Sequence, residues 1–426
     1  MRYLPQTKNS RAAMLQAIGV KSVDELYRDI PKSAFINGLA DIPLHMGELE
    51  VERKLGAYAN ENHAATDGPF FLGAGCYYHH IPATVDHIIQ RSEFLTAYTP
   101  YQPEIAQGTL NAIFEFQTFI ALLTGQEIAN ASLYDGATAT AEAALMAMRL
   151  TKRSKVVIGN ALHFDYRGVL QSYVGNLEGA SVVDGEPDGE TACVIVQYPD
   201  FYGATFLLAD WRKKCDAAGA LLVVAVNEIV ALGLLPAPDC ADIVCGEARS
   251  IGLPMSFGGP HLGFFATKEK FVRQMPGRLC GMTKDAQGRR GFVLTLSTRE
   301  QHIRREKATS NICTNQGLCA LAFTVHMALL GEDGFRRLAV LNHEAACRLA
   351  DAVTKIKGVK LLTKEFFNEF AVELPCDNAA DVVEALAKKG IIAGFALDDN
   401  QLLLAATEMT TDDDMSKLVK ALEGVL

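Results

Sequence analysis

The chain has 426 residues, a net charge of −10 and an apolar fraction of 49%, which describe a globular protein large enough for two domains. The acidic balance argues against a nucleic-acid partner, because no basic stripe is present to neutralise phosphates. The first fifteen residues have no apolar signal core, and no run approaches the roughly 20 apolar residues that span a bilayer. We therefore expect a cytoplasmic protein without a membrane partner.

The N-terminal region reads as short helical pieces that three prolines interrupt. Ser22 and Glu25 have capping-box spacing at the start of one piece. These features predict a helical arm over residues 1–60. A long amphipathic helix follows at residues 109–123. A glycine-containing turn at residues 134–138 then leads into an alanine-rich helix at 140–150.

Short β-type runs alternate with helices further along the chain. The runs are residues 155–158, 193–197, 221–226, 243–245 and 263–266, with a helix at 208–217 among them. This alternation predicts a mainly parallel sheet covered by helices, in a large α/β domain over residues 61–315. Such a domain is typical of pyridoxal phosphate (PLP) enzymes.

The order of predicted helices and strands changes after residue 315 and predicts a small α+β domain over residues 316–426. The expected helices are residues 318–330, 335–356, 379–389 and 412–422, and the expected strands are 359–362, 369–374, 391–397 and 401–405.

The large domain lacks the lysine that a PLP enzyme needs for its Schiff base. No lysine occurs in residues 215–267, where Arg249 is the only cation, and arginine stays protonated and forms no imine. A PLP enzyme also places an aspartate against the pyridine nitrogen after the run 221–226, where this chain has Asn227. The chain is therefore predicted to be one half of an active site.

Other residues mark where a cofactor pocket would lie. Gly136 and Thr138 stand at the start of a helix, whose free N–H groups suit a phosphate, although an ordinary capped helix explains them as well. His163 follows the first strand at the carboxyl edge of the sheet, and either lies against a cofactor ring or belongs to a surface loop. The 10 cysteines form no C-x-x-C pair, so we expect reduced structural thiols and no metal site.

Three segments resemble a known family. They are residues 98–108 (YTPYQPEIAQG), 256–265 (SFGGPHLGFF) and 298–316 (TREQHIRREKATSNICTNQ), supported by residues 2–5 and 71–75. Together they resemble the P-proteins of the glycine cleavage system, and among these the alpha subunits of the two-chain bacterial form.

The resemblance implies a type I PLP-transferase fold, like that of aspartate aminotransferase. It also implies glycine dehydrogenase (aminomethyl-transferring) activity with a partner, subunit 2, in an α2β2 heterotetramer. In that family, glycine is decarboxylated on PLP and its aminomethyl group passes to the lipoyl group of H-protein. The partner carries the PLP lysine, so no catalytic residue is expected in this chain. Asn227 and Arg249 depart from the family pattern, but only within a vestigial pocket.

The segment 98–107 is expected to complete the partner's active site. Its candidate contact residues are Tyr98, Thr99, Tyr101, Gln102, Glu104 and Gln107. Two prolines restrict its backbone, which suits a fixed loop that crosses an interface and excludes water from the partner's pocket. His79 and His80 are expected to border the same pocket. The alternative is a loop that packs only against its own subunit.

The run 298–307 has the spacing of a capped helix. That helix would present Arg299, His302 and Arg305 to a partner, or it is simply solvated. Residues 311–315 are expected to help shape the cleft between the domains.

Two other functions compete with the half-site hypothesis. One is a self-sufficient PLP aminotransferase or decarboxylase that uses Lys268 as its Schiff-base lysine. The other is a purely structural or regulatory subunit that contributes no group to an active site.

Overall fold

The computed structural model describes residues 6–36, 38, 42, 45–299 and 301–426. The quoted residues 2–5 lie outside this set, as does the side chain of His302. Two compact units form, Met1–His63 and Ala64–Leu426. The first contains helices α1 (Lys8–Ile18) and α2 (Glu48–Ala59) and the 3-10 turns η1 (Asp24–Tyr27) and η2 (Lys32–Ala34). The Ser22 hydroxyl accepts the Glu25 N–H at 3.4 Å, but the residues that follow form a 3-10 turn instead of an α-helix.

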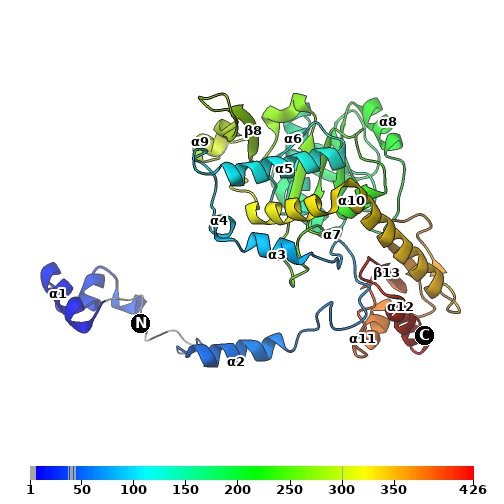
Figure 1. Ribbon diagram of the computed structural model, residues 1–426, viewed down its shortest axis with the longest axis horizontal. Coiled ribbons are helices and arrows are strands. Elements are labelled where there is room, and N and C mark those ends of the chain that lie inside the picture. The colour runs from blue at the N-terminus through cyan, green and yellow to red at the C-terminus, as the bar shows by residue number, and fades with distance from the viewer. Residues whose placement is uncertain (1–5, 37, 39–41, 43–44, 300) are drawn as a thin grey trace. The chain divides into compact units, whose positions relative to one another are not determined.

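A seven-stranded sheet forms in the second unit and lies among helices in Figure 1. Its strand order is β1-β7-β6-β5-β4-β2-β3. Its strands are β1 (Ile128–Ala129), β2 (Lys155–Ile158), β3 (Ser181–Asp184), β4 (Thr191–Gln197), β5 (Leu221–Val226), β6 (Ile243–Glu247) and β7 (Gly263–Thr267). The neighbours from β6 to β3 pair in parallel, and β7 and β1 pair antiparallel. The mainly parallel α/β sheet expected from the sequence is therefore confirmed.

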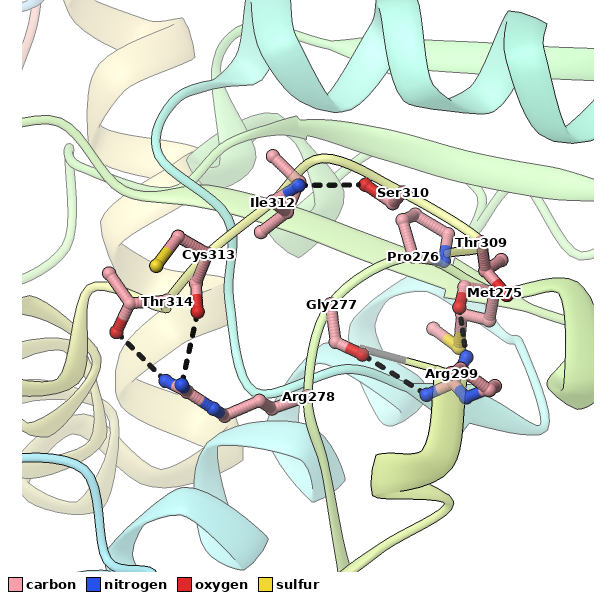
Figure 2. A pocket seen from close by; sticks show the side chains of 10 residues that line it. All are labelled: Met275, Pro276, Gly277, Arg278, Arg299, Thr309, Ser310, Ile312, Cys313 and Thr314. Carbon is pink, nitrogen blue, oxygen red and sulfur yellow. Dashed lines mark hydrogen bonds between the residues drawn. The ribbon is translucent and has the colours of Figure 1, made fainter. Parts of the chain in front are cut away.

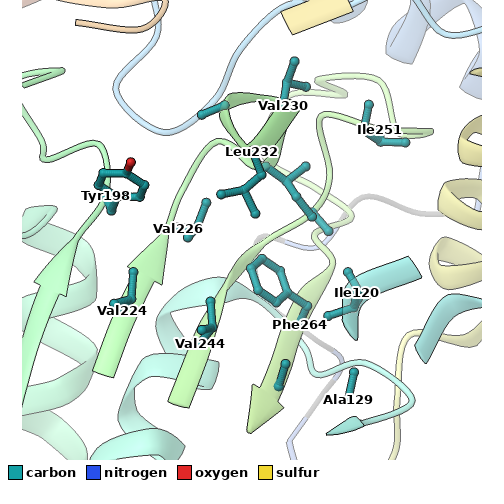
Figure 3. Close-up of a cluster of buried hydrophobic side chains, with 14 of the residues drawn as sticks. Ile120, Ala129, Tyr198, Val224, Val226, Val230, Leu232, Val244, Ile251 and Phe264 are labelled. Atoms are coloured by element: carbon teal, nitrogen blue, oxygen red, sulfur yellow. The ribbon is translucent and has the colours of Figure 1, made fainter. Parts of the chain in front are cut away.

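Helices cover both faces of this sheet, because its strands alternate their side chains between two cores. Val224 and Val226 face a core that contains Phe116 and Phe323, while Val223 on the same strand faces the alanines of α6. Figure 3 shows part of the first core, where Phe264 lies among aliphatic side chains. The covering helices are α5 (Gln107–Thr124), α6 (Gly136–Thr151), α7 (Phe164–Val174), α8 (Leu208–Ala218) and the N-terminal part of α10 (Gly317–Val353).

A separate four-stranded antiparallel sheet forms downstream, in the order β10-β11-β13-β12. It comprises β10 (Lys360–Leu361), β11 (Glu369–Glu373), β12 (Phe395–Ala396) and β13 (Gln401–Ala405), with helices α11 (Ala379–Ala387) and α12 (Asp412–Glu423). Gly331, with φ 61°, interrupts α10 between the two helical stretches expected from the sequence. The division into domains at residues 315 and 316 stays a prediction.

Several elements differ from the sequence expectations. The hairpin of β8 (Leu279–Lys284) and β9 (Arg290–Thr295) was not predicted. The helix expected over residues 298–307 is wrong, because the chain breaks there into η5 (Ser297–Arg299), α9 (Gln301–Arg304) and η6 (Arg305–Lys307). A positive φ of 54° at Arg305 accompanies that break. The remaining short elements are α3 (Ala83–Ile89), α4 (Ser92–Leu95), η3 (Ile229–Gly233) and η4 (Glu269–Gln274).

Helix α10 is long and apolar enough to cross a membrane by length and composition alone, which the sequence analysis did not anticipate. Core helices meet the same criterion, and Ala322, Phe323 and Met327 of α10 are buried in the main core. Each of the 10 cysteines is a free thiol in the part of the chain that the structure describes.

The core position of Phe323 provides a test of this packing. The ring is fully buried, with its centroid 5.3 Å from that of Phe116. Phe323→Ala is expected to lower the free energy of unfolding by about 3–5 kcal/mol, because it leaves a cavity. Leu329→Ala on the same helix, at a side chain that is 52% exposed, should change it by less than about 0.5 kcal/mol. Equilibrium urea unfolding measures both, and equal losses would contradict the assigned packing.

Candidate functional site

The N-terminus of α6 is the place where a phosphate was expected, and this chain's own carboxylates occupy it. Asp135 caps the helix: its carboxylate accepts the Thr138 backbone N–H at 2.7 Å and the Thr138 hydroxyl at 3.1 Å. The Gly136 N–H donates to Glu247 Oε2 at 3.1 Å. The expected turn at residues 134–138 is thus wrong, because the helix begins at Gly136 directly after its cap.

Glu247 closes the pocket from the end of β6. Its Oε1 accepts the N–H groups of Leu262 at 2.7 Å and Arg249 at 3.2 Å, and its Oε2 lies 3.4 Å from His261 Nδ1. Only 4% of Glu247 is exposed, so these donors replace the water that its charge would otherwise require. Gly136 is required at this point, because a Cβ would overlap the hydroxyl of Tyr166.

The backbone of residues 74 and 75 lies against His163, the side chain that was expected beside a cofactor ring. His163 is buried at the start of α7; its Nδ1 accepts the Asp165 N–H and its Nε2 lies 2.9 Å from the Ala74 carbonyl. The imidazole is thus neutral with its proton on Nε2, and burial lowers the pKa of His163. An ideal Cβ on Gly75 would lie 3.2 Å from the His163 ring and 3.7 Å from the Asn227 amide nitrogen, so the Gly75 backbone lies close to both side chains.

Asn227 is buried at the end of β5, where the aspartate of a PLP enzyme would stand. It is 4% exposed, and neither its amide oxygen nor its nitrogen has a hydrogen-bond partner among the described residues. A neutral amide tolerates this burial far better than a carboxylate would.

Arg249 stands where a PLP enzyme needs its lysine, and its guanidinium hydrogen-bonds to groups of the same chain. Its guanidinium donates to the carbonyls of Pro254 at 2.8 Å and Met255 at 2.7 Å, and to Cys76 Sγ at 3.0 Å. Lys268, the alternative Schiff-base residue, lies elsewhere at the far end of β7 and donates to the Asp239 carbonyl at 2.6 Å. The residues present do not fit a lysine-bound PLP, because Arg249 stands in place of the lysine and Glu247 takes the Gly136 N–H at the start of α6.

A buried network of charges fixes the segment that fills the pocket. His79 lies between two carboxylates, with Nδ1 2.9 Å from Glu408 Oε2 and Nε2 3.2 Å from Glu228 Oε2. Glu228 also accepts the Ser250 hydroxyl, and Glu408 accepts the Asn342 amide. The network encloses His79, which is 6% exposed, and its expected place beside the pocket of the 98–107 loop stays a prediction.

The titration of this network follows from its burial and charges. Burial disfavours the charged imidazole, but Glu408 and Glu228 outweigh it and raise the pKa of His79 to about 10. Burial likewise disfavours the Glu408 carboxylate, yet His79 and hydrogen bonds lower its pKa to about 2. Nearby, burial raises the pKa of Glu369 to about 7, while its carboxylate accepts the Ala74 N–H and the Tyr77 hydroxyl.

The 98–107 loop is exposed at its tip and anchored at its base. Tyr98 is 79% exposed, and Gln102 and Glu104 are also exposed. Gln107 is the first residue of α5, and its amide pairs with the Phe292 backbone in both directions, at 2.8 and 2.9 Å. The structure therefore assigns Gln107 to the anchor, while the tip presents polar and aromatic groups. A role in contacting a partner stays a prediction.

Two of the three family segments meet at the base of this loop. Tyr98, Thr99 and Pro100 line a cavity of about 220 Å³ together with Thr314 and Asn315. Arg278 joins the same segments, since it donates to the Tyr101 hydroxyl at 3.2 Å and the Thr314 hydroxyl at 2.8 Å. His80 is exposed and is not among the residues that line this cavity.

The basic residues expected on an interface helix are separated. Arg299 turns inward and donates to the carbonyls of Met275 and Gly277, as Figure 2 shows beside Arg278. Arg305 is exposed, and the side chain of His302 lies outside the described residues. The three do not share one helical face, because α9 covers only Gln301–Arg304 and the two arginines lie in the 3-10 turns on either side of it. Their part in an interface stays a prediction.

Sequence reasoning missed Glu247, Gly75 and Arg278. Glu247 could have been found from the sequence, because it is a glutamate within the otherwise apolar run 243–248, where a buried charge needs hydrogen-bond donors. No sequence signal distinguishes Arg278 from a loop arginine. Among the described residues, no group of three or more His, Cys, Asp or Glu side chains is arranged to hold a metal.

The strand order, the helix that opens at the carboxyl edge of the sheet and the second antiparallel sheet define a type I PLP-transferase fold with a closed cofactor pocket. A sphingosine-1-phosphate lyase from Burkholderia pseudomallei shares this fold, with a TM-score of 0.65 at 14% identity over 92% of this chain and 94% of that one.

Closer relatives identify the family. The family described as "Glycine cleavage system P-protein" matches residues 1–422. A probable glycine dehydrogenase (decarboxylating) subunit 1 from Caulobacter vibrioides is 55% identical over 446 residues, covering 100% of this chain and 99% of the relative. The crystal structure of an inhibitor-bound glycine decarboxylase (P-protein) is 43% identical with a TM-score of 0.92, and each chain covers 100% of the other. The chain belongs to the glycine cleavage system P-protein family.

The charge network predicts a pH-dependent stability. Because the folded pKa of His79 is about 10 and its ordinary value is 6.5, its contribution is complete below pH 6.5 and is lost as the pH rises through 10. His79→Gln leaves two buried carboxylates without a cation, so the free energy of unfolding should fall by about 3–5 kcal/mol at pH 6. The variant should also lose stability less steeply than the wild type between pH 6 and 9.

Urea unfolding at the two pH values measures this effect. His80→Gln is the matched control, because the exposed His80 contacts Glu408 through its backbone N–H, which the substitution keeps. Parallel pH profiles for wild type and His79→Gln would contradict a charged His79 in the folded protein.

Proposed function

We propose that this chain is the non-PLP (alpha) subunit of a glycine dehydrogenase (decarboxylating). With subunit 2 it would decarboxylate glycine and transfer the aminomethyl group to the lipoyl group of H-protein. The observation that carries this proposal is the self-contained pocket: Glu247 takes the Gly136 N–H, Gly75 lies close to Asn227, and Arg249 donates to its own chain where a lysine would be needed. A P-protein chain with such a pocket needs a partner for its chemistry.

The partner in this proposal holds PLP covalently, and the assembly is a cytoplasmic α2β2 heterotetramer. Relatives named subunit 1 support the existence of a second subunit. In this chain the pocket is closed by the protein itself, which supports placing the cofactor on the partner. This chain's contribution is then structural support and surface groups at the boundary with subunit 2.

The exposed loop of residues 98–107 is the surface that we assign to the partner's active site. Tyr98 and Glu104 project from a segment that prolines and the Gln107 anchor hold in place. Groups that are fixed before the partner binds lose little entropy on binding, so they can close a pocket against water. An unanchored loop would serve this purpose poorly.

The proposal is tested by glycine–bicarbonate exchange in the presence of lipoylated H-protein. The chain is assayed alone, then mixed with subunit 2, and subunit 2 is assayed alone. Exchange only in the mixture is expected. Exchange by this chain alone would favour the self-sufficient enzyme, and full exchange by subunit 2 alone would favour a purely structural or regulatory role.

Loop substitutions should reduce turnover without preventing assembly. Tyr98→Ala and Glu104→Ala are each expected to lower kcat/KM of the mixed enzyme about tenfold or more, since each removes a positioned group. Size-exclusion chromatography checks that the complex still forms. Glu178→Ala, at an exposed residue of the α7–β3 connection, should leave kcat/KM unchanged. Wild-type kinetics for both loop variants would remove the loop from the active site.

Restoring the lysine alone should not restore PLP binding. Arg249→Lys supplies an amine, but Gly75 still lies close to His163 and Asn227, and Glu247 still holds the Gly136 N–H. Titration with PLP should therefore give no saturable absorbance at about 410–430 nm, the range of a lysine-bound cofactor. Circular dichroism confirms that the variant is folded. A saturable band would show that the pocket opens readily and would contradict its closure by Glu247 and Gly75.

A further inference from the structure

Arg278 occupies an unusual position for a cation, because it is 5% exposed yet lies at the base of an exposed loop. Its Nη1 donates to Thr314 Oγ1 at 2.8 Å and to Asn315 Oδ1 at 3.3 Å, and its Nη2 donates to the Cys313 carbonyl at 3.0 Å. Figure 2 shows the guanidinium directed at Cys313 and Thr314. These contacts attach Arg278 firmly to one of the family segments.

The other family segment is held by the same guanidinium. Nη2 donates to the Tyr101 hydroxyl at 3.2 Å, and Cζ lies 5.5 Å from the centre of the Tyr101 ring. Arginine suits this double contact, because its planar group both donates in its plane and stacks on an aromatic face. Tyr101 itself is 54% exposed, so the contact reaches the surface.

The support behind Arg278 is rigid. The Arg278 carbonyl accepts the Ala131 N–H at 2.9 Å, and the Asn130 amide donates to the Pro276 carbonyl at 3.1 Å. Arg299 donates to the Gly277 carbonyl at 3.1 Å. The segment 313–316 is fixed to the same framework, since the Asn315 amide donates to the Ala131 carbonyl at 2.9 Å. The cation is thus positioned before any partner binds.

We propose that Arg278 is a positioning residue for the glycine decarboxylation reaction, which it serves by holding Tyr101 and thereby the 98–107 loop against subunit 2. This inference rests on the proposed function. Gln107 fixes the C-terminal end of the loop through Phe292, and Arg278 fixes its middle. The residues between these two anchors, 102–106, are then presented in one conformation.

The first test measures the loop in the isolated chain. Chymotrypsin cleaves after aromatic residues, and an ordered backbone resists it until the loop opens. Arg278→Lys and Tyr101→Phe should each speed cleavage within residues 98–102 about tenfold, because each weakens a hydrogen bond to a charged group. Arg273→Lys, at an exposed arginine five residues away, and Tyr202→Phe, at a half-exposed tyrosine, are matched controls with unchanged cleavage.

The second test measures turnover of the complex with subunit 2. Each variant should lower kcat of glycine–bicarbonate exchange about tenfold while KM for H-protein changes less. The double variant should lose no more activity than the more impaired of the two single variants, because both substitutions act through one contact. Tyr101→Phe keeps the ring of an exposed residue, so it reports on the contact even where Arg278→Lys folds poorly.

Three outcomes overturn the proposal. These are unchanged cleavage and turnover in both variants, losses that multiply in the double variant, or failure of Tyr101→Phe to assemble with subunit 2. The wild-type mixture separates this inference from the proposed function. If that mixture shows no exchange, the proposed function fails; if it is active and the variants match it, only the role of Arg278 fails.

Discussion

The carboxylate of Glu247 is the contact on which the centre of the large unit depends. It gathers the N–H groups of Gly136, Arg249 and Leu262, which belong to the start of α6 and to the segments on either side of the turn between β6 and β7. A helix N-terminus attracts an anion, and a buried carboxylate requires donors, so each satisfies the other. This exchange takes up the Gly136 N–H, a donor that would otherwise suit a phosphate.

The structure separates a closed interior from an open edge. The interior is held by buried charges, with His79 between Glu228 and Glu408. The edge carries exposed groups on a loop whose base is tied to the scaffold by Arg278 and Gln107. Surface groups that are held in place can contribute to a reaction in a neighbouring subunit, because they only have to be positioned and do not react themselves.

Sequence patterns predicted the sheet and most helices, because apolar runs and their periodicity reflect burial directly. The missing lysine and Asn227 likewise indicated an incomplete PLP site. Other features depend on tertiary contact and have no local signal: the short strand β1 is defined by pairing with β7. The inward turn of Arg299 is set by carbonyls more than twenty residues away in the chain. Glu247 was visible as a charge in an apolar run, but its partners were not.

Because the chain supplies the anion in its own pocket, the amount of folded chain does not depend on the supply of PLP. A protein that binds a ligand only when folded gains stability from that ligand by mass action, and it becomes vulnerable to degradation when the ligand is scarce. Here the stabilising anion is Glu247, which is made with the chain. In the proposed assembly, the folded chain would therefore accumulate at the same level whether PLP is plentiful or limiting, and it would be ready to bind a partner whose own maturation waits for the cofactor.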